Sequence, residues 1–186
     1  MRADYPLPRL WLLSDERNDK VLEHALRKLP RGSGFIFRHY HLSPRERLAR
    51  YRALRRLAKA RAHLVILSGS AAAARKWHAD GWYGPPGSPG VGGPRLLALA
   101  TVHDLREIAR ANRAGAHAAL LSPVFPTRSH AGAAALGPLR FRLMALRAAM
   151  PVIALGGINA RSARRLGWPR WAAIDGLSTA SARPLS

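Results

Sequence analysis

The sequence predicts an α/β protein, a compact (β/α)8 TIM barrel. Short apolar runs alternate with stretches that repeat apolar residues at helical spacing, and the alternation gives eight strand-and-helix units. Alternation of this kind implies a parallel sheet with right-handed crossovers. Because 186 residues are few for this fold, we expect degenerate fourth and last helices. An open doubly wound sheet is the structural alternative.

The first half of the chain is predicted to supply four strands and three helices. The strands are apolar runs that end in polar residues or glycine, and they cover residues 10–13, 35–38, 62–69 and 80–83. The helices cover residues 18–29, 44–61 and 71–79. Ser43, Pro44 and Glu46 mark the start of the second helix, because serine caps a helix and proline suits its first position. Arginines line the other faces of that helix, which indicates a solvated outer face.

The second half of the chain interrupts this alternation once. Residues 84–94 hold four prolines and five glycines, so they predict a loop in place of a helix. Strands are predicted at residues 95–100, 118–121, 152–155 and 171–178, and helices at residues 101–113, 139–150 and 162–166. The remaining residues leave no room for a full last helix. We expect one barrel domain over residues 1–186.

Composition restricts the chemistry and the partners. The chain has no cysteine, which excludes disulfides, thiolate metal sites and a cysteine nucleophile. No apolar run of about eighteen residues and no signal-peptide pattern occurs, so we expect a cytoplasmic protein that has no membrane partner. The net charge of +21 attracts nucleic acid nonspecifically and phosphorylated metabolites in a cleft. A dedicated nucleic-acid partner is not indicated, because too few aromatic residues accompany the cations of residues 44–61.

Two successive predicted strands end in groups suited to phosphate. The sixth strand leads into a loop that carries Thr127, Ser129 and His130. The seventh ends in Gly156 and Gly157, where the absence of side chains lets backbone N–H groups approach an anion closely. Five further histidines are expected to be structural, because no pair of them has metal-ligand spacing: His39, His41, His63, His78 and His117.

In combination these motifs resemble the thiamine phosphate synthase and TenI superfamily over nearly the whole chain. The strongest match runs from Pro123 to His130, Pro-Val-Phe-Pro-Thr-Arg-Ser-His, where the family has Pro-Val-Phe-Pro-Thr-x-Thr-Lys. Residues 101–104 are similar to its Ser-x-His-Ser/Thr element, residues 156–158 to its Gly-Gly-Ile, and residues 177–180 to its Val-Ser-Ala-Ile.

The resemblance implies a transferase that joins a pyrimidine diphosphate to a thiazole phosphate, releases pyrophosphate and forms thiamine phosphate. Phosphorylated thiamine precursors are then the partners. The substrate and diphosphate ligands implied are Arg38, Thr101, His103, Thr127, Ser129 and His130. The product phosphate ligands implied are Gly156, Gly157, Leu177 and Ser178. No catalytic residue is assigned.

The chain departs from the family where the family binds its metal. Mg²⁺ is implied by the resemblance, but Ser68 and Gly69 replace an Asn-Asp pair, and the later metal aspartate falls nearest to Ser88. The expected carboxylate ligands are therefore absent, and no metal ligand is assigned. The alternative function is a non-catalytic or TenI-like barrel that binds a phosphorylated ligand or acts in regulation. TenI-type chemistry uses a histidine where this chain has Pro123.

Overall fold

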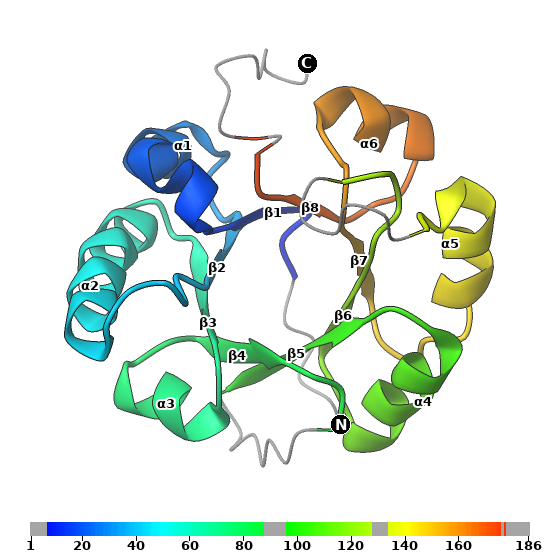
Figure 1. Cartoon of the computed structure of the whole chain (residues 1–186), viewed down its shortest axis with the longest axis horizontal. Helices are drawn as coiled ribbons and strands as arrows, with labels where there is room; N and C mark the ends of the chain where they lie inside the picture. The colour runs from blue at the N-terminus through cyan, green and yellow to red at the C-terminus, as the bar shows by residue number, and fades with distance from the viewer. Residues whose placement is uncertain (1–6, 88–95, 128–133, 176, 178–186) are drawn as a thin grey trace.

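Eight parallel strands close into a barrel (Figure 1). The computed structural model describes residues 7–87, 96–127, 134–175 and 177. The strands follow one another around the ring in sequence order, and the last pairs in parallel with the first. They are β1 (Leu10–Leu13), β2 (Gly34–Phe37), β3 (Leu64–Ser68), β4 (Gly81–Gly84), β5 (Leu97–Val102), β6 (Ala118–Leu121), β7 (Val152–Ala154) and β8 (Trp171–Ala173). The predicted (β/α)8 fold is confirmed, and closure excludes the open sheet.

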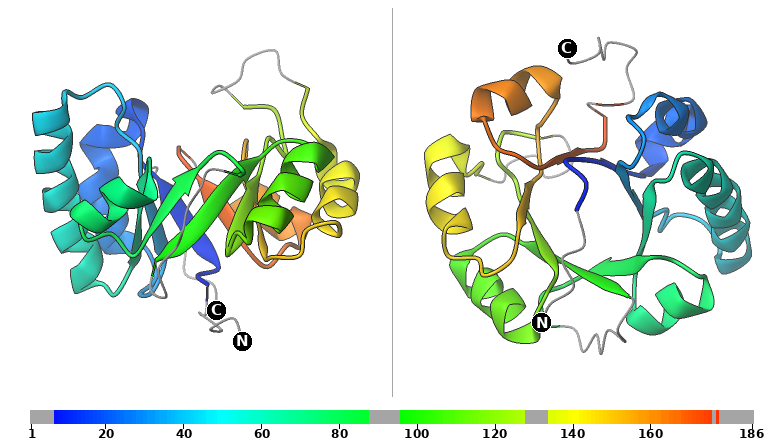
Figure 2. Two further views of the ribbon diagram at one scale, coloured as in Figure 1. Left: turned by 90° about the horizontal axis from the view of Figure 1, so that it is seen from below. Right: turned by 180° about the vertical axis from the view of Figure 1, so that it is seen from behind.

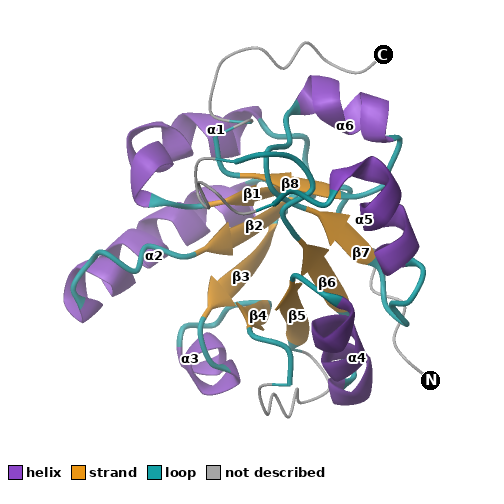
Figure 3. Cartoon of the chain, turned by 45° about the vertical axis from the view of Figure 1, so that its right-hand side comes forward, coloured by secondary structure: helices purple, strands orange, loops and turns teal. Residues whose placement is uncertain are grey.

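The helices surround the barrel and cover its outer face (Figures 2 and 3). They are the 3-10 helix η1 (Glu16–Val21) and the α-helices α1 (Leu22–Lys28), α2 (Pro44–Ala60), α3 (Ala71–Lys76), α4 (Leu105–Ala114), α5 (Gly137–Ala145) and α6 (Ala160–Leu166). Between β4 and β5 the described residues, 85–87 and 96, form no helix. This agrees with the loop predicted from the prolines and glycines, although residues 88–95, Ser88 included, lie outside the described part.

Side chains that alternate along the strands fill the barrel interior. The buried members of this inner cluster are Trp11, Leu13, Ile36, Ile66, Tyr83, Leu97, Leu99, Ala118, Leu120, Ile153 and Ala172. Their neighbours along the strands, such as Leu12 and Ala119, instead pack outward against the helices. Gly34 makes room for the largest inner side chain, because a Cβ at this position would overlap the Trp11 ring. The interior is thus a packed core, and open space is left at the barrel's end.

The helix predicted over residues 101–113 begins later, at Leu105. Thr101 and Val102 belong to β5, where Thr101 pairs with Leu120 of β6. Asp104 then caps α4, since its Oδ1 accepts a 2.7 Å hydrogen bond from Glu107 N. The correction places Thr101 at a strand end and His103 in the loop that leaves it.

Two further predicted boundaries were wrong near the closure of the barrel. The helix predicted over residues 18–29 is divided into η1 and α1, and the strand predicted over residues 171–178 ends at Ala173. The side chain of Asn18 explains both differences. Its Nδ2 donates one hydrogen bond to Leu13 O at the end of β1 and another to Ile174 O just after β8, each at 2.9 Å. The loop after β8 is therefore bonded to η1 and not to a continuing strand ladder.

Candidate functional site

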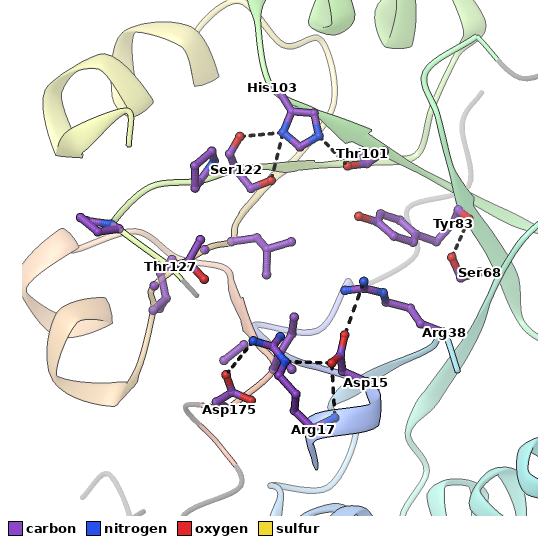
Figure 4. Close-up of a pocket in the computed structure, with 18 of the residues that line it drawn as sticks. Asp15, Arg17, Arg38, Ser68, Tyr83, Thr101, His103, Ser122, Thr127 and Asp175 are labelled. Atoms are coloured by element: carbon purple, nitrogen blue, oxygen red, sulfur yellow. Dashed lines mark hydrogen bonds and ion pairs between the residues drawn. The ribbon is translucent and has the colours of Figure 1, made fainter. Parts of the chain in front are cut away.

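A cavity of about 1060 Å³ opens where the strands end at their carboxyl termini (Figure 4). Residues at the ends of all eight strands, or in the loops directly after them, line the cavity, from Asp15 after β1 to Asp175 after β8. Active sites of TIM barrels lie at this end, because the loops there vary without disturbing the barrel. The cavity is therefore a candidate functional site.

Six of the residues implied by the family resemblance line the cavity. They are Arg38, Thr101, His103, Thr127, Gly156 and Gly157. Leu177 is not among the lining residues and packs, partly buried, against the cluster between the barrel and helices α1 and α2. Ser129, His130 and Ser178 lie outside the described residues.

Alternating charges form the rim beside β1, β2 and β8. Arg38 Nη2 lies 3.6 Å from Asp15 Oδ2, and Arg17 Nε donates to Asp15 Oδ1 at 2.9 Å. Arg17 Nη1 also lies 3.5 Å from Asp175 Oδ2. Burial alone would raise the pKa of Asp15, but the hydrogen bonds and charge of Arg17 and the charge of Arg38 lower it overall. Asp15 is therefore a carboxylate at neutral pH that holds two guanidinium groups beside the cavity.

Hydroxyl groups and an imidazole form the wall above β4, β5 and β6. In Figure 4 the Tyr83 hydroxyl points into the space that Arg38 also faces. Burial raises the pKa of Tyr83, so this group is a neutral hydrogen-bonding phenol at physiological pH. His103 Nδ1 lies 2.8 Å from Ser122 O, and since a carbonyl oxygen only accepts, Nδ1 carries a hydrogen. The other ring nitrogen, Nε2, faces Thr101 Oγ1 at 3.5 Å.

The Gly156 and Gly157 turn packs against the loop that follows β6. Both residues have positive φ, +94° and +62°, and a Cβ would lie 2.7 Å from Pro123 Cα or 2.5 Å from Pro126 O. Only glycine fits here without displacing backbone. Three successive backbone N–H groups donate no hydrogen bond to any other described residue: those of Gly156, Gly157 and Ile158. Three successive amides thus remain available to an anion at the cavity wall.

The residues that we describe do not fit the Mg²⁺ site implied by the family. Within the described ranges no group of three His, Asp or Glu side chains is placed to hold a metal ion. Ser68, which together with Gly69 replaces the family's Asn-Asp pair, bonds the Tyr40 hydroxyl. Asp15 and Asp175 do reach the cavity, but guanidinium groups already pair with them. A divalent cation there would face cations rather than hard oxygen ligands.

Sequence reasoning missed several lining residues. They are Asp15, Arg17, Tyr40, Ser122 and Asp175, together with Tyr83. One signal could have found two of them: like Arg38, Asp15 and Tyr83 are polar residues at the end of a predicted strand or just after it. Arg17 carried no such signal, because η1 decides the direction of its side chain.

A parallel barrel whose strand-end cavity combines guanidinium groups, hydroxyls and glycine amides defines a TIM-barrel protein with a candidate phosphate-binding site. A sequence model of the family described as thiamine monophosphate synthase matches residues 91–179. The chain is 29% identical over 161 residues to the Aquifex aeolicus protein named "Putative thiamine-phosphate synthase 2", covering 82% of this chain and 87% of that protein.

A sequence and a solved structure from Pyrococcus furiosus are also similar to this chain. The chain is 33% identical over 89 residues to a thiamine-phosphate synthase, a match that covers 48% of this chain and 42% of that protein. The solved structure of a thiamine phosphate pyrophosphorylase superposes with a TM-score of 0.77 at 25% identity, covering 92% of this chain and 88% of the other. Taken together, these similarities support a member of the thiamine phosphate synthase and TenI superfamily and a role in thiamine biosynthesis. None of the described helices is long and apolar enough to cross a membrane.

Proposed function

We propose that this chain is a thiamine phosphate synthase-type transferase that joins a pyrimidine diphosphate to a thiazole phosphate. One observation carries the proposal: Arg38, Thr101, Thr127 and the Gly156 and Gly157 turn come from four different strand ends and line one cavity. Each supplies a donor for phosphate oxygens, as a bidentate guanidinium, a hydroxyl or a backbone amide.

The reaction places specific demands on these groups. The bond between the pyrimidine methylene carbon and the diphosphate oxygen breaks, and the pair of electrons leaves with pyrophosphate. The thiazole nitrogen then donates its lone pair to the methylene carbon and becomes positively charged. Donors fixed around the departing oxygens stabilise the charge that develops there, and holding both substrates in one cavity replaces a bimolecular encounter.

The roles divide between the two sides of the cavity. Arg38 and Thr101, beside the neutral Tyr83 phenol, face the diphosphate, while the Gly156 and Gly157 amides receive the thiazole phosphate. Arg38 is able to do this because its 3.6 Å approach to Asp15 leaves most guanidinium donors for a ligand. No step is assigned to a metal ion, since the described side chains do not fit one.

Product formation tests the proposal. Purified protein with both precursors should release thiamine phosphate and pyrophosphate, each measured by chromatography, with Mg²⁺ and again with EDTA. Arg38→Ala should lower the rate by about 100-fold or more, because a donor aimed at the leaving group is lost. Arg52→Ala removes an exposed arginine of α2 and should leave the rate unchanged. Absence of product together with absence of binding of either precursor would contradict the proposal.

A second candidate, a barrel that binds the phosphorylated ligand without turnover, rests on a different observation. Ser68 and Gly69 replace the family's Asn-Asp pair, and the Ser68 hydroxyl bonds the Tyr40 hydroxyl. This end of the cavity therefore lacks the carboxylate that the family has there, while the Gly156 and Gly157 turn is kept. This candidate predicts that thiamine phosphate or pyrophosphate binds in calorimetry while both precursors stay unreacted.

A further inference from the structure

A buried chain of hydrogen bonds lies behind Arg38, outside the cavity lining. The Arg38 backbone N–H donates to Ser14 Oγ at 2.8 Å, and Ser14 Oγ lies 2.8 Å from His39 Nδ1. His39 Nε2 lies 2.8 Å from Asp19 Oδ1. Ser14 is 0% and His39 1% exposed. The chain therefore connects the backbone of the proposed diphosphate ligand with a carboxylate of η1.

Hydrogen-bond geometry permits one arrangement of protons along this chain. The Asp19 carboxylate only accepts, so His39 Nε2 carries the hydrogen. Ser14 Oγ accepts from Arg38 N–H, and among its described partners only His39 Nδ1 can accept the Ser14 hydrogen, so that hydrogen goes to Nδ1. Burial lowers the pKa of His39, although its hydrogen bond to Asp19 acts in the opposite direction. Every donor thus meets an acceptor when His39 is neutral with its hydrogen on Nε2.

Two arginines of helix α2 donate hydrogen bonds to the two ends of this hydrogen-bonded chain, Asp19 and Arg38. Arg50 Nε donates to Asp19 Oδ1 at 2.8 Å, and its Nη2 donates to Asp19 O at 2.9 Å. Arg47 Nε donates to Arg38 O at 2.9 Å. The Arg38 peptide groups are consequently held on two sides, by Ser14 at the nitrogen and by Arg47 at the oxygen.

The backbone of His39 is strained, and its ring is packed. Its φ is +40°, a value that residues other than glycine seldom adopt. The ring stacks on Phe37 with centroids 4.8 Å apart and planes 2° apart. Stacking and hydrogen bonding together maintain this turn. Because His39 follows Arg38 directly, this turn determines the backbone position of Arg38 just after the end of β2.

The order serine, histidine, carboxylate is also that of a hydrolase triad, but Ser14 does not act as a nucleophile. Its oxygen is fully buried and accepts from a backbone N–H, so no substrate reaches it. We propose that Ser14, His39 and Asp19 are positioning residues that fix the Arg38 backbone and so preorganise its guanidinium for the anionic end of the ligand. This inference rests on the proposed function, because it takes Arg38 as a phosphate ligand.

Binding of inorganic pyrophosphate, measured by calorimetry, tests the energetic part. Ser14→Ala should weaken binding about 10-fold or more, because a misplaced donor loses much of its effect. In an Arg38→Ala background the same change should have no further effect, since the two positions then no longer couple. Ser33→Ala is the matched control: Ser33 is also buried, but its hydroxyl donates to Pro30 O at the start of β2. Equal weakening by Ser14→Ala and Ser33→Ala would overturn the inference.

A measurement on the unliganded wild-type protein separates the two proposals. Nitrogen NMR of the histidine rings should show the hydrogen of His39 on Nε2, and the Arg38 amide should exchange slowly with solvent. Its exchange should accelerate in Ser14→Ala and not in Ser33→Ala. A hydrogen on Nδ1, or rapid Arg38 exchange in wild type, overturns the positioning role. If wild type binds neither pyrophosphate nor either precursor, the proposed function fails, and the amide exchange alone decides whether Arg38 is fixed.

Discussion

Single residues determine the shape of the proposed phosphate side of the cavity. Gly157 combines a φ of +62° with an approach that leaves no room for a side chain, since a Cβ would lie 2.5 Å from Pro126 O. The β6 loop and the β7 turn are further joined by hydrogen bonds from Val124 N to Leu155 O and from Phe125 N to Gly156 O. Two strand ends therefore form one unit.

Gly157→Ala should disturb this unit. The methyl group meets backbone that does not yield cheaply, so we expect the free energy of unfolding to fall by about 1 to 3 kcal/mol. Binding of thiazole phosphate should also weaken, because the loop with Thr127 must move. Denaturant unfolding and calorimetry measure the two effects. Gly32→Ala is the control, since Gly32 has a similar φ of +76° with nothing within 4 Å of a new Cβ. If both variants bind ligand equally well, the close approach does not matter for the site.

At the scale of elements, the start of α4 controls the position of His103. Asp104 Oδ1 accepts from Glu107 N at 2.7 Å, and Glu107 Oε2 accepts from His103 N at 2.7 Å. The cap and the site residue are thus joined through the first helical turn. This explains why the sequence boundary at Thr101 was wrong: the strand ladder with β6 continues to Val102, and the cap follows it.

Asp104→Ala should cost about 0.5 to 2 kcal/mol of stability, as loss of a helix cap usually does. It should also reduce turnover or ligand affinity, because His103 loses its support. Ser70→Ala provides a comparison, since Ser70 caps α3 through a 3.1 Å bond from Ala73 N and does not line the cavity. Thermal unfolding measures the loss of stability, and the product assay measures the loss of turnover. Equal activity in the two variants would show that the α4 cap serves stability alone.

At the scale of the whole molecule, buried histidines connect stability with pH. Burial lowers the pKa of His39 and of His63, whose Nε2 lies 3.0 Å from Leu26 O. In the unfolded chain both groups titrate near about pH 6.5. As the pH falls below that value, the unfolded state therefore binds more protons than the folded state, and folding is weakened. The loss levels off below the folded pKa values.

The free energy of unfolding should accordingly fall as the pH is lowered from about 6.5 toward 5. His63→Gln keeps an N–H donor for Leu26 O and should reduce this slope by up to one proton. His24→Gln, at an exposed position, should not change it. Denaturant unfolding at several pH values measures the slopes. An unchanged slope in His63→Gln would contradict the assignment of His63 as a buried neutral group.

The sequence by itself determined the order of strands and helices, and it identified the strand ends that carry the candidate phosphate ligands. Apolar runs predicted a barrel because parallel strands are buried on both faces, and the residues after the sixth and seventh runs predicted that Thr127 and Gly157 meet at one end. Arg38 was implied by the family resemblance. Local signals suffice for this, since each depends on neighbours in the chain.

Only the tertiary structure decided which polar side chains are hydrogen-bonded to one another. Ser14 and His39 are 25 residues apart, and Ser68 meets Tyr40 from a different strand. No local pattern encodes such contacts, because they depend on how strands lie beside one another in the ring. For the same reason a histidine expected to be merely structural lies directly behind the arginine of the proposed site.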